Sequence, residues 1–200
     1  MDVAELWFFS DTRFNFIVYD YTSMKMIEYE IKVLDINIDE VQSILKQKAF
    51  KEEETLHFKR YVFDTIPASE AAWVRLRTDG KTSTLTYKQS VKDSIDGVVE
   101  IEVGVDDFEQ TRKFLEKTGL RSKVYQENRR TIYRKGNVEA SIDYWPHIPP
   151  YMEIEGKNKR EVEKTLETLG LATHRTTSLP TAAVYELYNV NIDSYKKLKF

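Results

Sequence analysis

Alternation of apolar and charged residues is the clearest pattern along the chain. Residues 27–33 read IEYEIKV, in which every second residue is apolar and the others are two glutamates and a lysine. This period of two predicts a β-strand with one buried face. The same alternation recurs in VVEIEV at 98–103 and YMEIE at 151–155, and each stretch precedes an amphipathic helix pattern. The chain is therefore predicted to be α+β, with helices covering the apolar side of one antiparallel sheet.

Two hairpins between these units can be placed in register. RLRTDGKTSTLTYK at 75–88 contains Asp79-Gly80, which is typical of a two-residue type I′ turn. This loop places Arg75 opposite Thr84, with Lys88 on the same face. The other face then carries Val74, Leu76, Leu85 and Tyr87, a consistent apolar surface that supports the register.

The second hairpin, NRRTIYRKGNVEASIDYW at 128–145, turns at Gly136-Asn137. With these two residues as the loop, Arg130 stands directly opposite Asp143. A longer loop would shift the register by one and turn Arg130 to the other face. The charge run KEEE at 51–54 is interpreted as solvated charge of a loop or a helix start.

The charged faces of the predicted strands form the candidate functional surface. They carry Glu28, Glu30, Lys32, Arg75, Arg77, Lys88, Glu100, Glu102, Arg130, Asp143, Glu153 and Glu155. Such a sheet either stays open, with this face in water, or closes into a barrel with a charged interior. Three Glu-x-Glu repeats and one Arg-x-Arg favour the barrel, because open surfaces mix Thr, Ser, Gln and Lys.

The two kinds of charge on this surface predict two kinds of contact. Arginines and lysines grip a polyanion, and clustered carboxylates are the normal ligands of Mg²⁺ or Mn²⁺, which bridge to phosphate oxygens. Together they indicate a metal–polyphosphate site. On the pattern alone, a charged sheet held by structural ion pairs is the alternative.

Composition narrows the class of protein. The 30 basic and 33 acidic residues give a net charge of -3, which argues against a dedicated nucleic-acid binder. Cysteine is absent, so disulfides, thiolate zinc sites and cysteine nucleophiles are excluded. The three histidines show no metal-ligand spacing. No signal peptide or membrane span is recognisable, so we predict a cytoplasmic protein without membrane contact.

EYEIK at 28–32 resembles the E-x-E-x-K signature of the CYTH family, also called triphosphate tunnel metalloenzymes. Further elements match in order over residues 26–190: RLR at 75–77, LTYK at 85–88, EIE at 100–102, RTIY at 130–133, ID at 142–143 and MEIEG at 152–156. The family includes class IV adenylate cyclases, thiamine triphosphatases and inorganic triphosphatases. The resemblance implies a closed eight-stranded antiparallel barrel, the triphosphate tunnel, with helices outside.

The resemblance also implies roles for the charged residues. It assigns substrate binding to Arg75, Arg77, Lys88, Arg130 and Lys32. It assigns one or two divalent metals, Mg²⁺ or Mn²⁺, to Glu28, Glu30, Asp143, Glu153 and Glu155. Lys32, Glu100 and Glu102 are the candidate catalytic residues. One departure stands at Asn128, where the family commonly has a lysine, and we expect weaker or reoriented substrate binding from it.

The resulting prediction is a divalent-metal-dependent hydrolase of tripolyphosphate, a nucleoside triphosphate or thiamine triphosphate. An adenylate cyclase on the same site and a non-catalytic polyphosphate-binding module are the alternatives. Residues 26–200 form a single domain, and residues 1–25 are an N-terminal extension or an extra strand. The expected partner is a small-molecule triphosphate, and a homodimer is left open.

Overall fold

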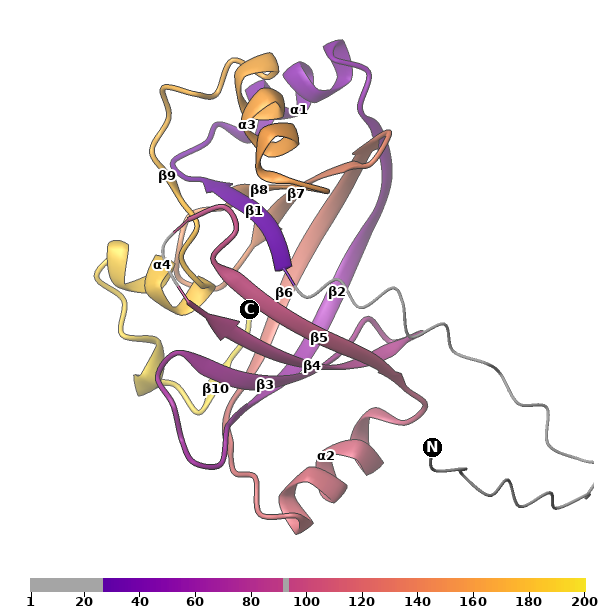
Figure 1. Cartoon of the computed structure of the whole chain (residues 1–200), viewed down its shortest axis with the longest axis vertical. Coiled ribbons are helices and arrows are strands. Elements are labelled where there is room, and N and C mark those ends of the chain that lie inside the picture. Colours follow the sequence, from indigo (N-terminus) through magenta and orange to yellow (C-terminus); the bar gives the residue numbers. More distant parts are fainter. Residues whose placement is uncertain (1–26, 92–93) are drawn as a thin grey trace, which may run out of the picture.

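Eight antiparallel strands form a closed barrel in the computed structural model, which describes residues 27–91 and 94–200 (Figure 1). The strands are β1 (Ile27–Val33), β2 (Lys51–Asp64), β3 (Ala72–Thr78), β4 (Ser83–Ser90), β5 (Val98–Val105), β6 (Ser122–Lys135), β7 (Val138–Tyr144) and β8 (Tyr151–Gly156). Their order is β6-β2-β3-β4-β5-β1-β8-β7, and β7 pairs back with β6. The predicted barrel is confirmed, and the open sheet is excluded.

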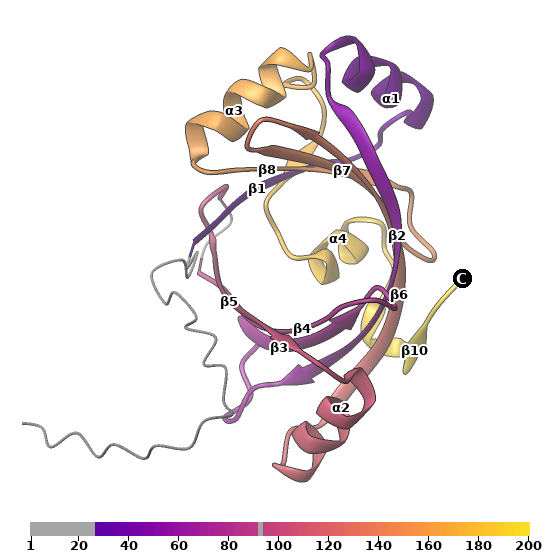
Figure 2. The same ribbon diagram turned by 90° about the vertical axis from the view of Figure 1, so that its right-hand side faces the viewer.

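Three helices pack on the outside of the ring (Figure 2). They are α1 (Ile38–Gln47), α2 (Phe108–Lys117) and α3 (Lys159–Thr168). Each begins at a side-chain cap, from Asn37, Asp107 and Asn158 respectively, that accepts hydrogen bonds from backbone N–H groups of the first turn. These caps therefore fix the residue at which each helix begins.

Two apolar cores lie between the strands and these helices, on the outside of the barrel. Helices α1 and α3 cover the outer faces of β1, β7 and β8, where Val33, Ile142 and Ile154 are fully buried. Helix α2 covers the outer side of β2–β4, where Phe63 and Leu76 are fully buried. Since apolar side chains take the outer face of each strand, the alternate charged side chains point inward.

The C-terminal segment lies across one end of the barrel (Figure 1, Figure 2). It contains β9 (Thr176–Thr177), α4 (Thr181–Leu187), the 3₁₀ helix η2 (Ile192–Ser194) and β10 (Lys197–Leu198). Val184 and Tyr185 of α4 are fully buried against Trp145 and Tyr151, and the Tyr185 hydroxyl donates a hydrogen bond to the Pro146 carbonyl at 2.7 Å. These contacts hold α4 in place.

The hairpin predictions had different outcomes. The β6–β7 loop is Gly136-Asn137, and Arg130 pairs with Asp143 as predicted. The predicted β3–β4 register was wrong by two residues, because the loop contains four residues and Arg75 pairs with Thr86. The Asp79 carboxylate accepts hydrogen bonds from two backbone N–H groups within this wider loop, which stabilises it. A shift of two keeps every side chain on its predicted face.

The interpretation of residues 51–54 as loop or helix-start charge was wrong, because they begin the 14-residue strand β2. Register irregularities between Glu52 and Thr55 and between Val62 and Phe63 interrupt the period of two along this strand. The alternation of apolar and charged residues therefore does not reveal this strand in the sequence.

The prediction for residues 1–25, an extension or extra strand, lies outside the described residues. No helix in residues 27–91 and 94–200 is long and apolar enough to cross a membrane.

Candidate active site

The barrel encloses one large cavity of about 1870 Å³. Its walls come from all the barrel strands, and the N-terminal residues of α4 contribute near one end. The predicted site residues that line it are Glu28, Glu30, Lys32, Arg75, Arg77, Lys88, Glu100, Glu102, Arg130, Glu153 and Glu155. The remaining one, Asp143, is fully buried in the wall beside Arg130. The structure thus brings together the residues that the sequence selected, and their individual roles stay predictions.

Carboxylates and lysines alternate on the side of the cavity formed by β1, β4, β5 and β8. The Lys32 ammonium lies 2.6 Å from the Glu30 carboxylate and 3.5 Å from Glu153. The Lys88 ammonium lies 2.7 Å from both Glu28 and Glu100. Strand pairing explains the contacts, because Lys32 is opposite Glu153 and Lys88 is opposite Glu100.

Burial and neighbouring charges shift the pKa values of Lys32 and Glu30. Burial lowers the pKa of Lys32, but Glu30 and Glu153 outweigh that effect and raise the pKa above its ordinary value. Burial raises the pKa of Glu30, and the negative charges of Glu28 and Glu153 add to this against the opposing effect of Lys32. The carboxylates are therefore close enough to repel one another and to favour a cation among them.

Arg130 is held rigidly from two strands. Its Nε and Nη2 donate to the two Asp143 carboxylate oxygens at 3.0 and 2.6 Å, and Nη2 also contacts Glu153. Burial raises the pKa of Asp143 to about 6, against the opposing effect of Arg130. Burial also acts to raise the pKa of Glu153, but Arg130 and Lys32 outweigh it and lower the value to about 2. Glu153 therefore stays ionised at neutral pH.

Two further arginines are held more loosely. Arg75 Nη2 lies 3.4 Å from Glu102 and 3.8 Å from Glu100, and its Nε is buried without a hydrogen-bond partner. Arg77 lies 3.8 Å from Glu102, and its guanidinium packs over the Phe58 ring at 4.5 Å. Burial, together with Arg75 and Arg130, lowers the pKa of Arg77 to about 10. Long contacts and crowded positive charge favour an anion between these groups.

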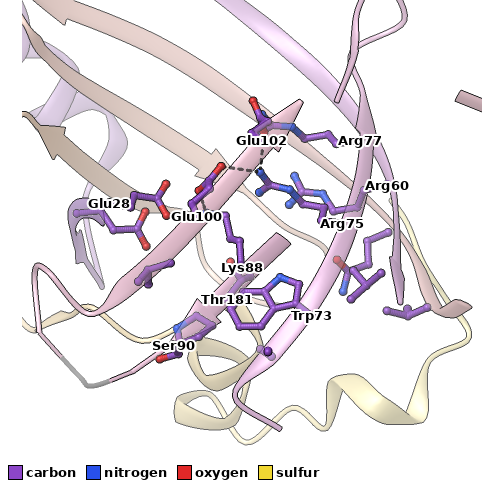
Figure 3. Close-up of a pocket in the computed structure, with 18 of the residues that line it drawn as sticks. Glu28, Arg60, Trp73, Arg75, Arg77, Lys88, Ser90, Glu100, Glu102 and Thr181 are labelled. Carbon is purple, nitrogen blue, oxygen red and sulfur yellow. Dashed lines mark hydrogen bonds and ion pairs between the residues drawn. The ribbon is translucent and has the colours of Figure 1, made fainter. Parts of the chain in front are cut away.

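Arg60 on β2 and Trp73 on β3 are among the cavity residues that sequence reasoning missed (Figure 3). Figure 3 shows Arg60, Arg75 and Arg77 gathered at one side of the cavity. The signal for Trp73 is present in the sequence, since it stands two positions before Arg75 and so shares its face. For Arg60 the interrupted alternation of β2 hides the signal.

Carboxylate oxygens are the ligands that a divalent metal prefers. In this structure, however, the carboxylates contact lysines and are not arranged around a metal position. Glu30 stands opposite Glu155 on β8, and Glu155 stands opposite Glu139 on β7, so three neighbouring strands each carry a glutamate at this level. Within the described residues, no three acidic or histidine side chains converge to hold a metal ion. Glu30 instead contacts Lys32, and Glu28 contacts Lys88. Metal binding would replace these contacts.

Asp143 differs from the other predicted metal ligands. Its oxygens accept hydrogen bonds from Arg130, from the Asn128 amide at 3.0 Å and from the Ser141 hydroxyl at 3.4 Å. In this arrangement the carboxylate fixes Arg130. A metal-ligand role for Asp143 stays a prediction.

Comparison with solved structures identifies the fold. The PH1012 protein of Pyrococcus horikoshii superposes with a TM-score of 0.64 at 21% identity, over 73% of this chain and 92% of that one. A Hippeastrum protein, described as a putative adenylyl cyclase with a dominant triphosphatase activity, gives a TM-score of 0.57 at 17% identity, over 85% and 99% of the two chains. At these identities the likeness concerns the fold.

Sequence comparison identifies the family. A Methanocaldococcus jannaschii protein named "Putative adenylate cyclase MJ0240" is 32% identical over 152 residues, which cover 72% of this chain and 86% of that protein. The family model of the CYTH domain matches residues 26–180, which contain every predicted site residue. This chain belongs to the CYTH family.

Proposed function

We propose that this chain is a divalent-metal-dependent triphosphatase. CYTH tunnel enzymes process triphosphates and are generally dependent on a divalent metal. The observation that carries the proposal is that cationic and carboxylate side chains line the same cavity inside the barrel. Arg75, Arg77 and Arg130 supply cations from β3 and β6, whereas Glu28 and Glu30 supply carboxylates from β1. A polyanion with an associated cation fits both sets at once.

The arginines and Lys88 are proposed to bind the phosphate oxygens of the substrate. Arg130 is fixed by two hydrogen bonds to Asp143, so it serves as the preorganised contact. Arg75 and Arg77, with ion-pair distances of 3.4 to 3.8 Å, exchange weak internal contacts for stronger ones to phosphate. Lys88 can leave Glu28 and Glu100 for the same purpose.

Glu28, Glu30, Glu153 and Glu155 are the residues proposed to hold the metal. When bound, a divalent cation neutralises charge on the phosphoryl oxygens and lowers the pKa of coordinated water. In the proposed reaction, a water oxygen forms a bond to the terminal phosphorus, and the bridging P–O bond breaks. The departing diphosphate, or diphosphate ester, takes the bonding electron pair, and the water proton passes to solvent.

Adenylate cyclase activity is the second candidate, and two observations favour it. The 32% identical relative carries an adenylate cyclase name, and the Trp73 ring lines the cavity directly opposite Lys88. An indole at this position offers a stacking surface to a purine ring. In that reaction the ribose 3′-oxygen of ATP forms a bond to the α-phosphorus instead. The bond from this phosphorus to the bridging oxygen breaks, pyrophosphate leaves with the electron pair, and the 3′-hydroxyl proton passes to solvent.

Product analysis separates these activities. The purified chain would be incubated with tripolyphosphate, ATP or thiamine triphosphate, each with Mg²⁺, Mn²⁺ or EDTA, and the Glu28→Gln variant would serve as the blank. We expect the wild type to release phosphate only when Mg²⁺ or Mn²⁺ is present. Cyclic AMP with equimolar pyrophosphate would instead identify a cyclase. Absence of turnover, with an increased melting temperature in tripolyphosphate, would identify a binding module.

A further inference from the structure

Arg60 is a buried cation that the roles assigned above do not use. It lies on β2, faces the cavity and is 7% exposed. Strand pairing places it directly opposite Arg77 on β3 and directly opposite Gln126 on β6. Like charges directly opposite one another destabilise a sheet. The pair therefore needs a compensating negative charge from elsewhere.

Arg60 has fewer carboxylates close to it than the neighbouring arginines have. Arg75, Arg77 and Arg130 each have a carboxylate within 4.0 Å, but in residues 27–91 and 94–200 no such ion pair reaches Arg60. Its Nη2 donates to the neutral Asn128 Oδ1, and its Nε is buried without an acceptor. Burial, together with Arg75, Arg77 and Arg130, lowers the pKa of Arg60 well below its ordinary value, and the more distant charge of Asp143 opposes this only in part.

Packing does not account for this arrangement. The Arg60 guanidinium lies 4.6 Å from the centre of the Trp145 ring and 5.9 Å from that of Phe58. Such cation–π contacts are weak compared with the cost of burying a cation that lacks a counter-ion. A methionine or leucine would fill the same space without that cost. Retention of a guanidinium here indicates an anionic ligand.

We propose that Arg60 is a fourth phosphate-binding arginine, and that Asn128 positions it. The inference rests on the proposed function, since the anion is the triphosphate itself, and Arg60 donates to one of its non-bridging oxygens together with Arg77. Asn128 is then part of the binding site. Its Oδ1 accepts from Arg60 and its Nδ2 donates to Asp143, so one amide links the positions of Arg60 and Arg130.

The test is calorimetric titration of tripolyphosphate into the full chain, with EDTA and separately with Mg²⁺. We expect Arg60→Gln to weaken binding about ten- to a hundredfold, which is typical of losing a charge-assisted hydrogen bond. Arg60→Lys, which keeps the charge but not the forked donor, should bind more tightly than Arg60→Gln. The matched control is Arg160→Gln, an exposed arginine on α3, which should bind as the wild type does.

Two further readouts separate ligand binding from a structural role. Without ligand, Arg60→Gln should melt at the wild-type temperature or above, because it removes an uncompensated buried cation. In the double variant Arg60→Gln/Asn128→Lys, an ammonium from β6 reaches the same region, and we expect it to restore most of the lost affinity.

Three results would overturn the proposal. Arg60→Gln that binds tripolyphosphate within twofold of the wild type would show that Arg60 does not contact it. A lower melting temperature without ligand, or failure of this variant to fold, would show that the arginine is structural. Wild-type protein that neither binds nor hydrolyses a triphosphate would overturn the proposed function together with this site. Wild-type protein that binds without turnover would overturn the hydrolase alone.

Discussion

Replacement of Lys32 by methionine tests the electrostatics of the barrel interior most directly. Lys32 is 2% exposed, and its ammonium lies 2.6 Å from Glu30 and 3.5 Å from Glu153. At an effective dielectric constant of about 20, a pair at such a distance attracts by about 6 kcal/mol before the cost of desolvation. Removal of one partner of a buried pair destabilises a protein by about 3–5 kcal/mol. We expect a loss of this size at pH 7.

The loss should depend on pH in a defined direction. Burial and the charges of Glu28 and Glu153 already raise the pKa of Glu30, and removal of Lys32 raises it further. Protonation of Glu30 removes the uncompensated negative charge, so the deficit of Lys32→Met should shrink as the pH falls from 7 toward 5. If the cavity accepts a divalent cation, Mg²⁺ should stabilise this variant more than it stabilises the wild type.

Urea unfolding followed by tryptophan fluorescence measures these effects. The experiment would be run at several pH values between 5 and 7.5, with and without Mg²⁺. Lys164→Met, at an exposed position of α3, controls for loss of a lysine in general and should cost little. A loss below about 1 kcal/mol for Lys32→Met at pH 7, or a loss that does not change with pH, would refute the reasoning.

Three other predictions concern the remaining charged residues. Arg75→Ala should raise KM about ten- to a hundredfold, and an unchanged KM would remove Arg75 from the phosphate contacts. Glu28→Gln should lower metal-dependent turnover about a hundredfold or more without loss of the fold by circular dichroism, and full activity would contradict its assignment as a metal ligand. For Glu153, Arg130 and Lys32 lower the pKa from 4.5 to about 2, so ionised Glu153 contributes stability that is fully present above pH 4.5. The free-energy deficit of Glu153→Gln in denaturant titrations should therefore narrow as the pH falls from 4.5 toward 2, and a constant deficit would contradict this.

The sequence was sufficient to predict which side chains point into the barrel wherever one face of a strand is apolar and the other is charged. Alternation placed Arg75, Arg77 and Lys88 on the inner face even though the β3–β4 loop length was wrong, because a shift of two residues preserves side-chain direction. The β6–β7 register, with Arg130 opposite Asp143, was correct in full. Family resemblance then supplied the closure into a barrel, which alternation alone leaves undecided.

The sequence was insufficient for β2. Irregular register interrupts the period of two, and both Phe63 on the outer face and Phe58 on the inner face are buried. Lys59 and Arg60 are adjacent in the sequence, yet Lys59 is exposed and Arg60 is buried in the cavity. Only the pairing of β2 with β3 and β6 distinguishes them. Barrel closure, a non-local property, therefore decided which cation belongs to the site.

The topology of β1 has a consequence for how the chain folds. Residues 27–33 pair with β8, near residue 154, and with β5, so neither edge of this strand is satisfied until much of the chain has been synthesised. Such non-local pairing slows folding and leaves strand edges exposed to other chains. Charged residues on an unpaired strand disfavour its association with a second molecule. We therefore expect Glu28, Glu30 and Lys32 to disfavour pairing of this strand with other chains before it enters the barrel.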